Sequence, residues 1–276
     1  MPRKVSIGLI GCGAIGSEIA KAIDQGLIPN AELKAALDKN PQAAHTLNIQ
    51  LRRSFKPVKT LTQMLRANID LVVEAASQQA VREYAERILK SRKDMLVLSV
   101  GALLDSTLLN RLLQTCQRYR QRIYVVSGAL GGIDAIKAAS IIGFHDLTLT
   151  TRKHPSALAS SPFFAERRLD PNTIKVPTIL YEGNPVEAVR LFPTNVNVAA
   201  TLTLAASPKS PWIRVVADPS LDVNIHEVVA RGEFGEITIV MKNTPSPKNP
   251  KTSYIAALSA ISALKSICTY GLEVGS

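Results

Sequence analysis

The pattern nearest the amino terminus that could do chemistry is Gly11-Cys-Gly-Ala-Ile-Gly16, three glycines in GxGxxG spacing. The first glycine permits a tight turn, the second lets a pyrophosphate approach the backbone, and the third lets a helix pack against a strand. An apolar run that predicts a strand precedes the pattern, and a predicted helix follows it. We therefore expect a dinucleotide site at that helix amino terminus. Its members would be Gly11, Cys12, Gly13, Ala14, Ile15 and Gly16.

An acidic residue follows the second predicted strand. Asp38 lies 22 residues after Gly16, close to the ~20 typical of dinucleotide-binding folds. Its carboxylate would accept hydrogen bonds from the adenosine ribose and repel a 2′-phosphate, which favours NAD over NADP. Lys39 follows at once and leaves NADP open. The alternative interpretation of the glycines is a turn that only joins strand to helix.

A histidine lies in an alternating stretch of the second half. In Asp222-Val-Asn-Ile-His-Glu227, alternation places Asp222, Asn224 and His226 on one face of a predicted strand. Of the four histidines in the chain, only His154 and His226 have polar neighbours of this kind. Imidazole exchanges a proton near neutral pH because its ordinary pKa is about 6.5. We expect His226 to transfer a proton in a cleft, the alternative being a structural histidine.

Polar and basic groups elsewhere in the second half are candidates for substrate recognition. Asn195 and Asn197 open a predicted helix, and each is either an N-cap or a carboxamide that contacts the nicotinamide amide or a substrate oxygen. Lys153 ends a strand-like run and is either a solvated charge or a carboxylate ligand. The same two interpretations, helix cap or carboxylate ligand, apply to the residues before the last helix, Lys251, Thr252 and Ser253.

Apolar runs alternate with amphipathic segments through the first half, the pattern of a parallel sheet with helices on both faces. The expected strands are Val5–Ile10, Glu32–Leu37, Asp70–Ala76, Met95–Val100 and Ile123–Val126, and the expected helices are Ser17–Asp24, Leu61–Arg66, Gln79–Lys90 and Leu103–Arg120. Ligands of such sheets bind beyond the carboxyl ends of the strands. Ala76 and Ser77 lie at such an end, so we expect them to contact the cofactor.

After residue 133 the pattern becomes less regular. The expected helices are Ile133–Gly143, Pro185–Phe192, Asn197–Ala206 and Thr252–Thr269; Leu147–Thr151, Trp212–Ala217, Val223–Ala230 and Glu236–Met241 are expected strands, the last three in an antiparallel sheet, and Pro245–Pro250 is expected to be a loop. We predict an α/β protein with two domains. A Rossmann-type doubly wound parallel sheet would occupy residues 1–133, and a smaller α+β substrate and dimerisation domain residues 134–251. The helix in residues 252–276 would pack back on the first domain.

The composition narrows the class of protein further. The 276 residues are 46% hydrophobic and 20% charged, a globular balance that excludes a disordered chain. No apolar run reaches the ~18 residues of a membrane span. The net charge of +11 comes from scattered Lys and Arg. We interpret it as solvated helix faces, with attraction of an anionic substrate second and no nucleic-acid partner. The three cysteines form no disulfide framework or metal motif, so we expect a cytoplasmic protein without metal.

Together the motifs resemble the L-aspartate dehydrogenase family over nearly the whole chain. In the first half they are GCGxIG, the acid at Asp38, VVEAAS (Val72–Ser77) and SGALGG (Ser127–Gly132); in the second half they are TRKHP (Thr151–Pro155), NVNVAATL (Asn195–Leu202), DVNIHEV (Asp222–Val228) and NPKTS (Asn249–Ser253). The last three are specific. The glycine loop alone would not separate the family from homoserine dehydrogenases or dihydrodipicolinate reductases.

The resemblance implies NAD(P)-dependent deamination of L-aspartate to oxaloacetate and ammonia through iminoaspartate, and the reverse reaction. In some organisms iminoaspartate feeds NAD synthesis. It implies that His226 is the catalytic histidine and that Ala129 or Leu130, together with Asn197, contacts NAD. His154 stands where the family pattern leads us to expect a proline or small residue.

Two other functions remain open on sequence grounds. One is a related NAD(P)-dependent oxidoreductase that acts on another small carboxylate or a semialdehyde. The other is a regulator that binds NAD(H) without turnover, and the polar face around His226 argues against it. Because an open sheet face in the second domain must be covered, we also expect a homodimer.

Overall fold

The structure is a computed structural model that describes residues 4–194, 196–247, 249–272 and 274. The chain forms two compact units. The first contains Met1–Val126 and Ala257–Val274, and the second contains Ser127–Ala256. The last helix therefore begins in the second unit and continues in the first.

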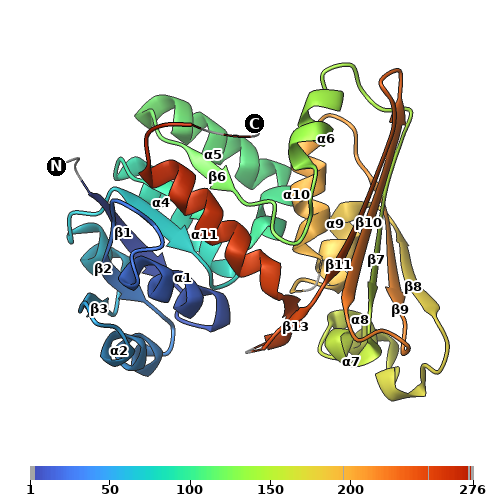
Figure 1. Ribbon diagram of the computed structural model, residues 1–276, viewed down its shortest axis with the longest axis horizontal. Helices are drawn as coiled ribbons and strands as arrows, with labels where there is room; N and C mark the ends of the chain where they lie inside the picture. Colours follow the sequence, from blue (N-terminus) through green and yellow to red (C-terminus); the bar gives the residue numbers. More distant parts are fainter. Residues whose placement is uncertain (1–3, 195, 248, 273, 275–276) are drawn as a thin grey trace. The chain divides into compact units, whose positions relative to one another are not determined.

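A six-stranded parallel sheet forms the centre of the first unit, in the order β3-β2-β1-β4-β5-β6 (Figure 1). Its strands are β1 (Val5–Ile10), β2 (Ala31–Leu37), β3 (Lys56–Val58), β4 (Leu71–Glu74), β5 (Asp94–Val97) and β6 (Ile123–Val125). The strand order reverses between β1 and β4, the position where dinucleotides bind in sheets of this kind. The predicted doubly wound sheet is confirmed.

Helices cover both faces of this sheet. On one face, apolar side chains of α1 (Ala14–Asp24), α2 (Pro41–Gln50) and α11 (Tyr254–Cys268) share a core with β1 and β2. On the other face lie α4 (Gln78–Lys90) and α5 (Ser106–Tyr119) (Figure 1). Two shorter elements of this unit are α3 (Leu61–Leu65) and the 3-10 turn η1 (Val100–Leu104), which precedes α5. Within the described residues, no helix combines the length and apolar character needed to cross a membrane.

The second unit is built on a five-stranded mixed sheet, in the order β11-β10-β7-β9-β8. Its strands are β7 (Asp146–Lys153), β8 (Thr178–Gly183), β9 (Trp212–Ala217), β10 (Asn224–Gly232) and β11 (Gly235–Asn243). β9 runs parallel to β7, whereas the other pairs are antiparallel. Of the three strands expected in one antiparallel sheet, β10 and β11 pair as expected, whereas β9 does not pair with them and lies between β7 and β8. The unpredicted β8, four α-helices and one 3-10 turn lie between β7 and β9 in sequence and supply the long crossover that a parallel pair needs.

Helices pack on one face of this second sheet. The main ones are α6 (Ile133–Ala139), α9 (Pro185–Leu191) and α10 (Asn197–Ala205), with shorter turns at α7 (Pro155–Leu158), α8 (Pro162–Arg167) and η2 (Pro171–Thr173) (Figure 1). The segment expected to be a loop at Pro245–Pro250 instead contributes to a two-stranded ribbon. Its strands are β12 (Pro245–Ser246) and β13 (Asn249–Ser253).

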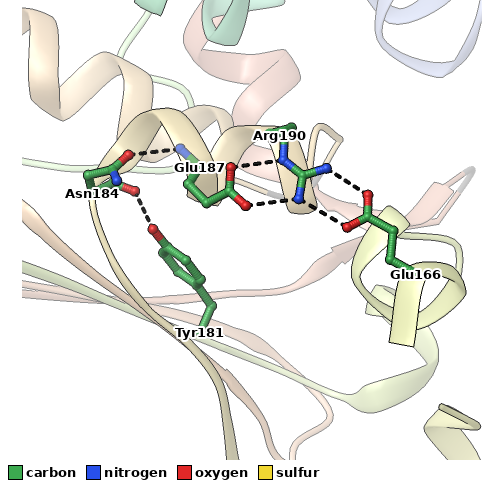
Figure 2. A network of polar contacts seen from close by, with 5 residues as sticks. All are labelled: Glu166, Tyr181, Asn184, Glu187 and Arg190. Atoms are coloured by element: carbon green, nitrogen blue, oxygen red, sulfur yellow. Dashed lines mark hydrogen bonds and ion pairs between the residues drawn. The ribbon is translucent and has the colours of Figure 1, made fainter. Parts of the chain in front are cut away.

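A polar network ties α8 to α9 at the surface of the second unit (Figure 2). Arg190 of α9 donates to Glu166 of α8 at 2.6 Å and to Glu187 of its own helix at 2.8 Å. The hydrogen bonds from Arg190 lower the pKa of both carboxyl groups. Asn184 caps α9, and its carbonyl accepts a hydrogen bond from the Tyr181 hydroxyl. These contacts fix the position of the arginine-rich segment around α8.

Candidate functional site

The three glycines of the GxGxxG pattern differ in what the fold requires of them. Gly11 has φ +94°, and a Cβ there would lie 2.5 Å from the carbonyl oxygen of Ala75. A Cβ on Gly16 would lie 1.9 Å from the Gly11 carbonyl oxygen. Gly13 has φ −74° and nothing within 4 Å of its Cβ position. Packing therefore explains why residues 11 and 16 are glycines. At Gly13 no protein atom requires a glycine, and the open space beside its backbone fits a bound ligand.

Helix α1 begins directly at this space and carries no side-chain cap. Four other helices of the same unit start with a side chain that accepts a backbone N–H: α2, α3, α4 and α5, capped by Asn40, Thr60, Ser77 and Asp105. At α1 the cap position is Gly13, so the N–H groups of the first turn lack that side-chain partner. They give the helix start a partial positive charge. The loop thus fits the pyrophosphate of a dinucleotide, which needs close backbone approach and N–H donors.

Asp38 lies beside the glycine loop. One carboxylate oxygen accepts the Cys12 N–H at 2.7 Å, and the other accepts the Asn40 N–H at 2.8 Å. The carboxylate is thereby fixed at the end of β2 with acceptor capacity to spare for ribose hydroxyls. Burial and the charge of Asp38 raise the pKa of the Cys12 thiol to about 12, so this thiol stays protonated and unreactive.

A buried acid that the sequence analysis did not single out organises the neighbouring loops. Glu74, at the end of β4, accepts the N–H groups of Ala76 and Ser77, each at 2.8 Å. It also accepts the N–H of Ser99 at 3.0 Å and its hydroxyl at 2.9 Å. Burial raises the pKa of Glu74, and the four hydrogen bonds oppose that rise. The Glu74 carboxylate therefore fixes the backbone of Ala76 and Ser77 at the end of β4. In the sequence, the only sign of this role is a single acidic residue after an apolar run.

In the second unit, the helix-covered face of the sheet changes from apolar to polar along the strands. Leu149 of β7 and Val228 of β10 lie opposite each other and are buried in the core. Two residues further along each strand, on the same face, Thr151 lies opposite His226. The Thr151 hydroxyl and the His226 Nδ1 atom are 3.1 Å apart, and His226 is only 1% exposed. The imidazole is thus held in a buried polar patch rather than at the sheet surface.

Lys153 extends this patch by one more position along β7. Its side chain is 3% exposed, and burial lowers its pKa to about 8. Burial also lowers the pKa of His226 to about 3, with a further contribution from the charge of Lys153. At neutral pH the patch therefore contains a neutral imidazole beside an ammonium group. A buried cation next to a proton acceptor is suited to bind an anionic substrate and to take a proton from it.

Three more polar side chains complete the patch. They belong to Asn224, Asn243 and Ser253, and all three are buried. The Asn224 amide donates to the Ser253 hydroxyl at 3.3 Å. The Asn243 amide donates to the carbonyl of Ala129 at 3.0 Å, which fixes the 127–132 loop against β11. Asn224 pairs with Asn243 in the strand register. The SGALGG loop and the His226 strand are therefore parts of one compact unit.

Some predicted site residues lie elsewhere. Asn195 is outside the described residues, as is the side chain of Lys251. Asn197, the first residue of α10, and Thr252, in β13, are half-buried. Asp222 is exposed and precedes β10, so its expected place on the His226 face is wrong. The strand, and with it the alternation, starts only at Asn224.

The other histidines have structural or surface positions. His154 is exposed, and its ring nitrogen accepts the Ser156 N–H at the start of α7. His45 and His145 are exposed as well. Across the described part of the chain, no group of three or more His, Cys, Asp or Glu residues is placed to hold a metal. His226 is the histidine that the fold places in a buried polar patch.

The strand order and glycine turn of the first unit are those of a dinucleotide-binding domain, the class of domain that binds NAD in dehydrogenases. Residues 11–126 match the family model described as "Homoserine dehydrogenase, NAD binding domain". Residues 134–267 match "Aspartate dehydrogenase, C-terminal". The predicted NAD cofactor and dehydrogenase class are confirmed.

Curated relatives give the family itself. The chain is 44% identical to an L-aspartate dehydrogenase of Methanococcoides burtonii, across 98% of this chain and 99% of that protein. It is 47% identical to an L-aspartate dehydrogenase of Methanosarcina mazei, across 95% of this chain and 97% of that protein. The chain belongs to the L-aspartate dehydrogenase family, as its motifs predicted.

Solved structures agree with this assignment. The aspartate dehydrogenase of Thermotoga maritima is 25% identical, with a TM-score of 0.75 over 99% of this chain and 100% of that chain. A homoserine dehydrogenase of Thiobacillus denitrificans has a TM-score of 0.61 at 13% identity, over 96% of this chain and 73% of that chain. The second likeness shows a shared fold.

Proposed function

We propose that the protein catalyses L-aspartate + NAD⁺ + H₂O → oxaloacetate + NH₄⁺ + NADH + H⁺, through iminoaspartate. The observation that carries this proposal is the buried pair of Lys153 and His226, in the unit that matches the C-terminal aspartate dehydrogenase model. A dicarboxylate is the substrate expected for a buried ammonium with a neutral proton acceptor beside it. The reverse reductive amination uses the same groups.

The ammonium of Lys153 pairs with one substrate carboxylate in this proposal. Ser253 presents a hydroxyl close to Asn224, and Asn195, Lys251 and Thr252 are the remaining substrate-binding candidates. A bound carboxylate offsets the positive charge that lowers the pKa of His226, so the imidazole becomes a stronger base in the complex.

His226 then accepts a proton from the substrate amine or from the water that attacks the imine. Thr151 holds the Nδ1 side of the ring, which leaves the other nitrogen for the transfer. NAD supplies the acceptor for the hydride that leaves the substrate Cα. The residues proposed to hold it are Gly11, Cys12, Gly13, Ala14, Ile15, Gly16, Asp38, Ala76, Ser77, Ala129, Leu130 and Asn197.

We further propose that the two units are the dinucleotide-binding domain and the substrate domain. Asp38 supports a preference for NAD over NADP, because a fixed carboxylate at the end of β2 repels a 2′-phosphate. The exposed Lys39 beside it could pair with a 2′-phosphate, so the kcat/KM values with NAD and with NADP are the quantities to compare. An Asp38→Ser variant should shift the ratio of kcat/KM values toward NADP.

A homodimer formed through the second sheet is also proposed. The sheet face opposite His226 carries Trp212, Val240 and Ile179, which are 53%, 50% and 54% exposed. Apolar side chains exposed together on a sheet favour burial against another surface. Light scattering on the purified protein gives the mass, and Trp212→Arg should lower it if this face is the interface.

We place the protein in the cytoplasm, a location supported by the unpaired state of Cys12, Cys116 and Cys268. We also propose that the reaction needs no metal, and that it feeds NAD biosynthesis through iminoaspartate. Activity after treatment with a chelator tests the first of these two statements.

The decisive experiment is to incubate the purified protein with L-aspartate and NAD⁺ and to follow the absorbance of NADH. Product analysis should show equal amounts of oxaloacetate, ammonia and NADH. Absence of turnover with both cofactors and in both directions would reject the proposal. A panel of other amino acids, hydroxy acids and semialdehydes then tests a related oxidoreductase, and NADH binding without any turnover would indicate a regulator.

A further inference from the structure

A cavity lined by arginines lies in the first unit, away from the carboxyl ends of its strands. It has a volume of about 420 Å³ and is lined by Arg92, Arg118, Tyr119 and Arg120. Arg92 lies two residues before β5, and Arg120 lies three residues before β6. In a parallel sheet the amino ends of the strands lie on the edge opposite the glycine loop. The cavity is therefore distinct from the dinucleotide site.

The three arginines that line the cavity differ in their ion pairing from other arginines of the described chain. Among the described residues, five other arginines form ion pairs with glutamates: Arg111, Arg152, Arg190, Arg214 and Arg231. No ion pair of the described chain involves Arg92, Arg118 or Arg120. Arg118 instead lies 5.8 Å from the ring centroid of its neighbour Tyr119. All three arginines are exposed, so solvent screens part of the repulsion between their charges, and a bound anion would offset the remainder.

Helix chemistry explains only part of this cluster. Arg118 lies in the last turn of α5, where a cation interacts favourably with the helix dipole. Arg120 ends that helix in the left-handed conformation with φ +57°, and Arg92 has the same φ one residue beyond the cap of α4. Glycine or asparagine is the usual residue at such positions. Arginine at both is unfavourable for the backbone and adds positive charge to the cavity.

We propose that this cavity binds a small multivalent oxyanion of the phosphate class. Three arginines can surround phosphate oxygens with charge-assisted, bidentate hydrogen bonds, which a single arginine cannot do alone. The anion could be inorganic, or it could be the phosphate end of a larger metabolite. The shared chemistry is a phosphate group with at least two negative charges. A metabolite that carries a ring has Tyr119 to stack on, whereas an inorganic anion does not.

The test is a binding titration with the glycine loop saturated by NAD⁺, so that phosphates do not report on that site. Orthophosphate, pyrophosphate and ADP are titrated by calorimetry at constant ionic strength. We expect saturable binding of pyrophosphate, weakened at least about tenfold in the triple variant R92N/R118Q/R120N. Asparagine tolerates the left-handed backbone, so this variant is expected to fold. Tighter binding of ADP than of pyrophosphate would indicate a metabolite, and equal binding an inorganic anion.

Arg168 supplies the matched control. It is exposed, has φ +53° at the end of α8 and does not line the cavity. R168N should bind pyrophosphate as the parent chain does, and R92K/R118K/R120K should retain part of the affinity. Equal binding by the parent chain and the triple variant would overturn the proposal, as would an equal loss in R168N. Tight binding of oligonucleotides alone would show a nucleic-acid surface and would also overturn it.

Discussion

Thr151 and His226 lie directly opposite each other on antiparallel strands, with the Thr151 hydroxyl 3.1 Å from Nδ1 of the imidazole. Among the contacts of the described residues, this is the one hydrogen bond of the His226 ring. The backbone register therefore fixes the orientation of the ring, and Nε2 is the nitrogen proposed to transfer the proton.

Replacing His226 by alanine should lower kcat by roughly 10²–10⁴-fold, the usual contribution of a general acid–base group. The Kd for NADH should stay within about threefold of the parent value, a change of less than ~1.4 kcal/mol in binding free energy, because the glycine loop proposed to hold NAD is unchanged. Stopped-flow turnover and fluorescence titration measure the two quantities. His145→Ala, at an exposed position, is the control and should retain full activity. Retained turnover in His226→Ala would show that another group moves the proton.

Replacing Lys153 by methionine should raise KM for aspartate by at least about tenfold, because a buried charge-assisted contact is lost. In the parent chain KM should also rise as the pH passes about 8, where the Lys153 ammonium loses its proton. That rise should be absent from the variant. Arg152→Met is the matched control, since Arg152 is the next residue of β7 and is exposed. Equal KM values for the two variants would contradict the role of Lys153.

The shifted pKa of His226 predicts a dependence of stability on pH. Its pKa is about 3 in the folded chain and about 6.5 when unfolded. As the pH falls through this window the unfolded chain binds a proton that the folded chain does not, so the free energy of unfolding decreases. The slope from one such group is at most about 1.4 kcal/mol per pH unit. Urea unfolding between neutral pH and about pH 4 should therefore show a shallower loss in His226→Gln than in the parent chain.

The three glycines should respond differently to alanine. Gly13→Ala should change the free energy of unfolding by less than about 1 kcal/mol, because its Cβ position is open. The same variant should bind NAD at least about tenfold more weakly, because the new methyl group occupies the ligand space. Gly16→Ala should cost about 3 kcal/mol or more, since its Cβ would collide with the Gly11 carbonyl. Calorimetric titration and thermal unfolding separate the two effects, and normal NAD affinity in Gly13→Ala would exclude the pyrophosphate position.

Glu74→Gln should destabilise the first unit by about 1–3 kcal/mol, because an amide nitrogen cannot accept one of the hydrogen bonds now made to the carboxylate. The four donors come from Ala76, Ser77 and Ser99. Denaturant unfolding measures the difference. Glu83→Gln, at an exposed site on α4, should stay within about 0.5 kcal/mol of the parent. Similar losses in both variants would argue against the buried carboxylate.

Sequence patterns located most of the strands, because parallel strands are buried on both faces and appear as apolar runs. The edge strands β3 and β8 were missed. β3 has the sequence Lys-Pro-Val, and its proline and charge are typical of an edge rather than a centre. β4 ends at Glu74 and not at Ala76 as predicted. The Glu74 side chain accepts the N–H groups of Ala76 and Ser77, so these groups do not form strand-to-strand hydrogen bonds.

The candidate site was predictable in part. The glycine loop and Asp38 were found because their chemistry depends on local spacing in the chain. His226 and Lys153 were found by residue type, but their burial could not be read from the sequence. Asn243 was missed because its partner, the carbonyl of Ala129, is 114 positions away. Such a contact depends on strand register, which tertiary packing decides.

The boundary between the units falls at Val126 and Ser127, just before the SGALGG loop. The loop thus leaves β6 and joins the body that contains His226, where Asn243 fastens it. The chain crosses between the bodies again at Ala256 and Ala257. The SGALGG loop and the imidazole therefore belong to one folded body, and contacts inside that body alone determine the distance between them.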